Sequence, residues 1–140
     1  MNSNELPHGY AFKPDWEVTP TQAQKWLDSG ENIMIVDVRV QPEWDFAHVK
    51  GSVLVPLDQL ETRAPEIEGM LEENPGCKVL TLCHHGVRSL KAAAFLRDLG
   101  ISDVKSIAGG IELWSRTADT NLPRYERQGM TVWPAGSKPV

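Results

Sequence analysis

One short segment of the chain combines the residue types that a nucleophilic site needs. It reads Cys83-His84-His85-Gly86-Val87-Arg88-Ser89. A cysteine thiolate is a strong nucleophile, and an arginine can present two N–H donors to an oxyanion. The segment therefore predicts that Cys83 attacks an anionic substrate and that Arg88 binds it.

The flanking elements place this segment where ligands bind. Lys78 to Leu82 is typical of a buried strand, and apolar residues at helical spacing predict a helix from just after Arg88 to Gly100. A short loop between a strand and a helix directs backbone N–H groups inward, beside the positive end of the helix dipole. We therefore expect an anion cradle in which Cys83 exists largely as the thiolate. The predicted substrate-binding residues are His84, His85, Gly86, Val87, Arg88 and Ser89.

The charge distribution agrees with an anionic substrate. Residues 74–97 contain four basic residues and no acidic ones, whereas the rest of the chain holds 10 basic and 19 acidic residues, or -9. The total of -5 disfavours nucleic acid or an anionic membrane as a partner. A small anion remains compatible with the positive segment.

The second cysteine has no such surroundings. Two cysteines are too few for a disulfide scaffold, and the strand between Cys77 and Cys83 would separate them by about 20 Å, against a disulfide limit near 7 Å. A thiol outside a cradle is usually a packing residue. We expect Cys77 to pack and Cys83 to react.

The chain as a whole has the size and composition of one ordinary domain. It has 140 residues, of which 41% are hydrophobic and 24% charged. Met1 to Glu5 carries no basic targeting region, and the longest aliphatic run, Ile33 to Val36, is far below the roughly 20 residues that span a bilayer. We therefore expect a cytoplasmic protein without a membrane partner.

Strand and helix patterns alternate along the middle of the chain. Strands are predicted over 33–38, 52–56, 78–82 and 104–107, and helices over 20–29, 57–71 and 89–99, the second with breaks at Pro65 or Gly69. This alternation predicts an α/β fold with an open, mostly parallel β-sheet and helices on both faces. The expected division is an irregular leader (1–17), the domain (18–115) and an extended C-terminal tail (116–140) packed on it through Leu122, Tyr125 and Trp133.

The two histidines of the loop leave an alternative open. With Cys83, His84 and His85 could ligate a metal, but adjacent side chains in a tight loop diverge, and no second ligand pair has zinc-like spacing. We interpret them as residues that shape the electrostatics or entrance of the cradle. No metal and no cofactor is expected.

Three motifs in the same order resemble the rhodanese family of sulfurtransferases. Cys-x-x-x-x-Arg after a buried strand resembles the active loop of that family. The family's N-terminal signature is matched by three segments of this chain: Asp37-Val38-Arg39, Pro42-Glu43-Trp44 and His48-Val49-Lys50-Gly51-Ser52. Gly109–Trp114 is similar to the family's C-terminal Gly-Gly-x-x-x-Trp motif. One departure is Ala47, where the family usually has glycine. The resemblance covers about residues 18–115.

The resemblance implies a sulfur transfer in two steps. Cys83 would take a sulfane sulfur from thiosulfate or another persulfide donor, and the resulting persulfide would pass it to cyanide or a thiol. Arg88 would bind the donor's oxyanion, Asp37 and Arg39 would be structural residues near the site, and Glu43 and His48 would be fold determinants. The implied partners are a small anionic donor, a thiol or cyanide acceptor and, as an option, a protein sulfur donor or acceptor.

Two other functions compete with sulfur transfer. A cysteine phosphatase or arsenate reductase uses the same thiolate and arginine but resembles Cys-x-x-x-x-x-Arg, one residue longer than the spacing from Cys83 to Arg88. A catalytically weak rhodanese-like domain would instead act as an interaction or sulfur-relay module, with the tail around Leu122-Pro123-Arg124-Tyr125 docking a partner. The presence of both Cys83 and Arg88 favours the enzyme.

Overall fold

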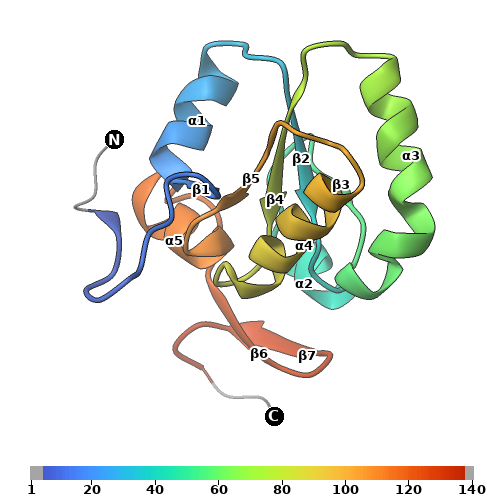
Figure 1. Ribbon diagram of the computed structural model, residues 1–140. Coiled ribbons are helices and arrows are strands. Elements are labelled where there is room, and N and C mark those ends of the chain that lie inside the picture. Colours follow the sequence, from blue (N-terminus) through green and yellow to red (C-terminus); the bar gives the residue numbers. More distant parts are fainter. Residues whose placement is uncertain (1–4, 138–140) are drawn as a thin grey trace.

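A parallel β-sheet with helices on both faces dominates the computed structural model, which describes residues 5–137 (Figure 1). The parts of the predicted leader and tail at residues 1–4 and 138–140 lie outside the described residues. No helix among the described residues is both long and apolar enough to cross a bilayer.

Five parallel strands form the main sheet, in the order β1-β5-β4-β2-β3. Their bounds are β1 (Glu17–Val18), β2 (Ile33–Asp37), β3 (Val53–Leu54), β4 (Lys78–Leu82) and β5 (Val104–Ile107). β4 is central, and its carboxyl end leads directly into the loop that begins at Cys83. The predicted fold class is confirmed, because each strand pairing in this sheet is parallel.

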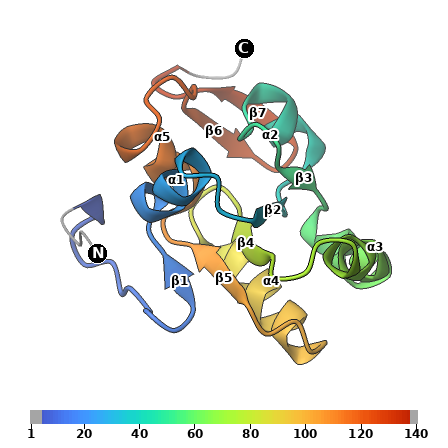
Figure 2. The same cartoon turned by 90° about the horizontal axis from the view of Figure 1, so that it is seen from above.

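The helices divide between the two faces of the sheet (Figure 2). Their bounds are α1 (Pro20–Asp28), α2 (Gln41–Phe46), α3 (Leu60–Glu72), α4 (Val87–Asp98) and α5 (Gly110–Thr117), with a 3₁₀ turn at Leu57–Gln59. Ile35 and Leu80 pack with Trp114 of α5, whereas the adjacent residues of their strands, Val36 and Val79, pack with Leu96 of α4. Burial on both faces explains why β2 and β4 are largely apolar and do not alternate between apolar and polar residues.

The predicted helix boundaries agree closely with the structure where capping residues mark them. Thr19 Oγ1 accepts the N–H of Gln22 at 3.2 Å at the start of α1, and Gly30 follows its end with a φ of 77°. The predicted break at Pro65 does not occur, and α3 is one helix. Buried Ala64 and Ile67 on either side of Pro65 keep this helix against the sheet.

The C-terminal segment forms more structure than the extended tail that the sequence predicted. β6 (Tyr125–Gln128) and β7 (Thr131–Pro134) pair as an antiparallel hairpin, which we call the C-terminal hairpin. Tyr125, only 2% exposed, packs into the core with α5. The polar sequence of β6 carries no strand pattern, so only the pairing with β7 makes it a strand. α5 also ends at Thr117, two residues beyond the expected domain boundary.

Candidate active site

The sulfur of Cys83 lies at the centre of the loop between β4 and α4. Sγ accepts the N–H of Gly86 at 3.1 Å and the N–H of Ser89 at 3.3 Å, and it lies 3.3 Å from Ser89 Oγ. Gly86 has a φ of 103°, and a Cβ there would lie 3.1 Å from the backbone nitrogen of Gly109. Glycine thus permits the turn that directs these N–H groups at the sulfur.

Buried hydroxyls support this cradle from the neighbouring strands. Ser89 Oγ lies 2.7 Å from Ser106 Oγ of β5, and Thr81 Oγ1 of β4 donates to the carbonyl oxygen of Ser89 at 2.7 Å. Ser89, Ser106 and Thr81 are fully buried. Sequence reasoning missed Thr81 and Ser106, because a single hydroxyl in a strand carries no signal until the sheet places it under the loop.

The Gly-Gly motif at the start of α5 holds the other side of the loop. The N–H of Ile111 donates to the carbonyl oxygen of Cys83 at 2.9 Å, and the N–H of Glu112 to that of His84 at 3.1 Å. A Cβ on Gly110 would lie 2.4 Å from the carbonyl oxygen of His84 and 2.5 Å from that of Cys83. Only glycine lets α5 approach closely enough to bind both carbonyls.

Arg88 is engaged by a buried carboxylate rather than free in the cavity. Its Nη1 and Nη2 donate to Glu43 Oε1 at 2.7 Å and Oε2 at 3.0 Å. Burial alone would raise the pKa of Glu43, but the hydrogen bonds from Arg88 and Tyr125 lower it to about 2. Burial alone would lower the pKa of the Arg88 guanidinium, but its hydrogen bonds to Glu43 raise this pKa above its ordinary value. Both groups are therefore charged, and Glu43 positions Arg88 as well as stabilising the fold.

A second buried ion pair lies behind this one. Arg39 and Asp37 are fully buried, with Arg39 Nη2 2.7 Å from Asp37 Oδ2. Arg39 Nη2 also donates to the carbonyl oxygen of Ala47 at 2.7 Å, and Nη1 donates to the hydroxyl of Tyr125 at 3.1 Å. Tyr125 in turn donates to Glu43 at 2.6 Å. Arg39 is thus linked to the site through Tyr125 and Glu43, and Asp37 holds Arg39 in place.

Ala47 fits its backbone position without strain, and His48 lies outside the cavity. Ala47 has a φ of -161°, an extended conformation that any residue adopts. The exposed ring of His48 stacks on Trp44 at 3.9 Å between centroids, and its Nδ1 lies 2.9 Å from the Trp44 carbonyl oxygen. His48 therefore contacts α2 and not the loop.

His84 and His85 differ in burial and contacts. His84 is 5% exposed, and its ring stacks on Tyr125 with centroids 4.0 Å apart. Its Nε2 lies 3.1 Å from the carbonyl oxygen of Tyr125 and donates to it, since a carbonyl only accepts. Burial lowers the pKa of His84 to about 4, so the ring is neutral. His85 is exposed at the rim. Within residues 5–137, no three His, Cys, Asp or Glu residues are grouped to hold a metal ion.

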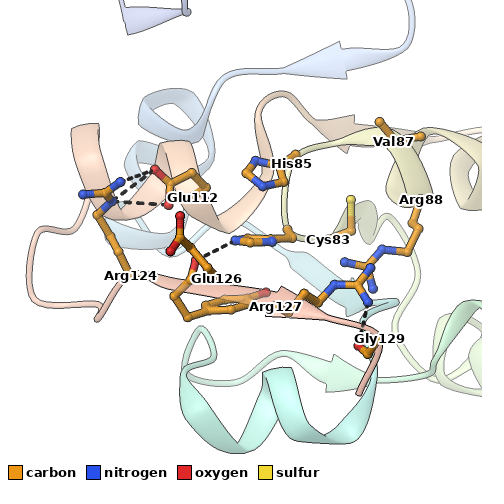
Figure 3. A pocket seen from close by; sticks show the side chains of 11 residues that line it. Cys83, His85, Val87, Arg88, Glu112, Arg124, Glu126, Arg127 and Gly129 are labelled. Atoms are coloured by element: carbon orange, nitrogen blue, oxygen red, sulfur yellow. Dashed lines mark hydrogen bonds and ion pairs between the residues drawn. The ribbon is translucent and has the colours of Figure 1, made fainter. Parts of the chain in front are cut away.

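A cavity of about 710 Å³ opens over Cys83 between the loop and the C-terminal hairpin (Figure 3). Its volume falls within the range typical of small-molecule sites. From the loop and α4 it is lined by Cys83, His84, His85, Val87 and Arg88, and from α5 and the hairpin segment by Glu112, Arg124, Tyr125, Glu126, Arg127 and Gly129. Sequence reasoning missed the second group as site residues, because their tail carries no recognisable motif.

The predicted site residues lie either on the cavity wall or beneath it. Cys83, His84, His85, Val87 and Arg88 line the cavity, whereas Gly86 and Ser89 lie beneath it with their N–H groups on the sulfur. Cys77 lies immediately before β4. Its thiol is half-buried, and burial raises the pKa of this thiol. Cys77 and Cys83 are both free thiols.

Comparison with known proteins assigns the fold and the motifs to a family. Residues 19–117 match the family described as the rhodanese-like domain. The chain belongs to this family. This chain is 26% identical to a rhodanese-like domain protein of Staphylococcus aureus. The two structures match with a TM-score of 0.61 over 76% of this chain and 95% of that one. A thiosulfate sulfurtransferase of Pseudomonas aeruginosa shares the fold, with 24% identity and a TM-score of 0.64 over 74% of this chain and 19% of that one.

Curated relatives contain the rhodanese-like domain as part of longer proteins. The chain is 32% identical over 77% of its length to the probable adenylyltransferase/sulfurtransferase MoeZ of Mycobacterium tuberculosis, of which it covers 26%. It is 33% identical over 89% of its length to the adenylyltransferase and sulfurtransferase MOCS3-1 of Zea mays, of which it covers 27%. The chain thus spans about a quarter of the length of these relatives.

Proposed function

We propose that the chain is a sulfurtransferase that carries a sulfane sulfur on Cys83 as a persulfide. The observation that carries this proposal is the pair of N–H groups, from Gly86 and Ser89, directed at Sγ at 3.1 and 3.3 Å beside an open cavity. Such donors stabilise negative charge on sulfur, both in the attacking thiolate and in the persulfide. The relatives that are named sulfurtransferases support the same reaction.

The first step takes sulfur from a donor such as thiosulfate. The Cys83 thiolate attacks the outer sulfur, a new S–S bond forms, and the old S–S bond breaks as sulfite leaves with its electron pair. Arg88 uses two of its five N–H groups on Glu43, so the others remain for the donor's oxygens. The product is a Cys83 persulfide with its negative terminal sulfur in the cavity.

The second step passes the terminal sulfur to an acceptor. Cyanide attacks that sulfur, the persulfide bond breaks towards Cys83, and thiocyanate and the thiolate result. A thiol acceptor reacts in the same way and becomes a persulfide itself. Because the relatives pair this domain with an adenylyltransferase in one chain, a protein is a further candidate as donor or acceptor.

Intact-mass measurement after treatment with thiosulfate tests the proposal. We expect the wild-type chain and the Cys77→Ser variant to gain one sulfur atom, which cyanide removes as thiocyanate. Cys83→Ser should gain none. An unchanged wild-type mass, or added sulfur that persists in Cys83→Ser, would contradict the proposal.

The same preparations separate the competing functions. A cysteine phosphatase would hydrolyse a phosphate ester faster than it transfers sulfur from thiosulfate. An interaction module would form no persulfide at Cys83. Either outcome would replace sulfur transfer as the proposed function.

A further inference from the structure

The C-terminal hairpin lies beyond residues 19–117 of the family match, yet it forms one wall of the cavity. Tyr125 anchors it, since its ring is buried and its hydroxyl donates to Glu43 and accepts from Arg39. This anchor presents Arg127 to the cavity, with its Nε 3.4 Å from Glu43 Oε2. The hairpin is thus fixed on the site rather than loosely attached.

The charges around Glu43 do not cancel once Arg127 is included. Arg88 and Glu43 alone form a buried, bidentate pair whose net charge is zero. Arg127 contacts the same carboxylate, so two guanidinium groups share one negative charge and one positive charge is left in excess. Without the hairpin, this end of the cavity would present an almost neutral pair to an incoming anion.

The excess charge lies at the reactive end of the cavity. Figure 3 shows Arg88 and Arg127 side by side below the sulfur of Cys83, whereas Arg124 and Glu112 lie at the opposite end. Arg124 is held by Glu112, with Nη2 2.9 Å from Oε2. Arg124 is therefore held away from the sulfur, and Arg127 is the arginine of the hairpin segment that lies beside Arg88 at the reactive end.

We propose that Arg127 is a specificity-determining residue, which with Arg88 binds the doubly negative head of the sulfur donor and makes the site prefer dianionic donors. This inference rests on the proposed sulfur transfer. When Cys83 attacks the outer sulfur of thiosulfate, the breaking S–S bond leaves its electron pair on sulfite. Arg127 favours both the bound dianion and this leaving group.

Two donors that differ by one charge test this proposal. Thiosulfate and methanethiosulfonate react at the same kind of outer sulfur and release sulfite and methanesulfinate, respectively. We expect Arg127→Ala to lower kcat/KM for thiosulfate about tenfold more than for methanethiosulfonate, mainly through KM. Arg127→Lys should recover most of the preference, because it keeps the charge.

Two other arginines serve as comparisons. Arg116 pairs with Glu112 outside the cavity, and Arg116→Ala should leave the preference between the donors unchanged. Arg124→Ala should reduce it far less than Arg127→Ala. The proposal would be overturned if Arg127→Ala lowered kcat/KM equally for both donors. It would also be overturned if Arg124→Ala reduced the preference for thiosulfate as much as Arg127→Ala does.

Binding of inorganic sulfate provides a readout that needs no sulfur transfer. Titration of the wild-type chain, followed by NMR at the amides of Gly86 and Ser89, should show binding that Arg127→Ala weakens at least about fivefold. No binding, or equal binding in that variant, would overturn the inference. If sulfate binding requires Arg127 but Cys83 forms no persulfide, the anion site stands and the proposed function fails. If the persulfide forms equally well from thiosulfate in Arg127→Ala, the inference alone fails.

Discussion

The contact between Gly110 and the reactive loop leads to a prediction about both stability and activity. Gly110→Ala places a Cβ 2.4 Å from the carbonyl oxygen of His84 and 2.5 Å from that of Cys83. These neighbours are backbone atoms, which cannot move aside as a flexible side chain can. The substitution must therefore push α5 and the loop apart.

The cost has two parts that the structure separates. An alanine held at a φ of 63° costs about 1–2 kcal/mol in any setting. Restoring a normal carbon–oxygen contact requires a shift of about 1 Å, since such contacts lie near 3.3–3.6 Å. That shift weakens the hydrogen bonds from Ile111 and Glu112 to the loop, each worth about 1 kcal/mol. We expect a total loss of about 3–4 kcal/mol in the free energy of unfolding.

Gly30→Ala is the matched control. Gly30 also has a positive φ, 77°, but a Cβ there would meet nothing within 4 Å. Urea unfolding should give a loss of about 1–2 kcal/mol for Gly30→Ala and about 2 kcal/mol more for Gly110→Ala. Persulfide formation should fall about 100-fold in Gly110→Ala, because the cradle shifts by about 1 Å, and stay normal in Gly30→Ala. Equal losses of stability in the two variants would refute this reasoning.

Two further predictions concern the buried charges around the site. Arg88→Ala should lower the free energy of unfolding in urea by about 3 kcal/mol, because it leaves the fully buried Glu43 carboxylate without its main partner. Arg63→Ala breaks the exposed pair with Glu66 and should lower it by less than about 1 kcal/mol. Similar losses in the two variants would contradict the value for Arg88→Ala. Stability should fall as the pH drops from 6.5 towards 4, because unfolded His84 binds a proton that the native ring, with its pKa of about 4, does not bind. His84→Gln should flatten this part of the pH profile of urea unfolding.

Below pH 4.5, Glu43 should add to the same acid destabilisation. Its pKa in the native state, about 2, lies below its ordinary value of 4.5, so its contribution is complete above 4.5 and is lost as the pH falls towards 2. Unchanged stability between pH 6.5 and 2 would contradict the buried, hydrogen-bonded states of both groups.

The central fold was predictable because its signals are local. Short, largely apolar runs such as Ile33–Asp37 predict strands buried on both faces, and Thr19 and Gly30 mark the two ends of a helix. The short α2 and the C-terminal hairpin were not predicted. Their residues follow no hydrophobic period of sufficient length, and pairing between strands depends on contacts that a local pattern does not contain.

For the site, the sequence alone determined the loop from Cys83 to Ser89, because the spacing of thiol, glycine and arginine and the positive segment around them are properties of neighbouring residues. Only the tertiary structure decided that Glu43 binds Arg88 and that Arg127 joins the same carboxylate. Glu43 lies 45 positions before Arg88. Charged residues so far apart in the sequence come into contact only because α2, α4 and the hairpin pack together. That packing therefore sets the net charge at the end of the cavity where a substrate would bind.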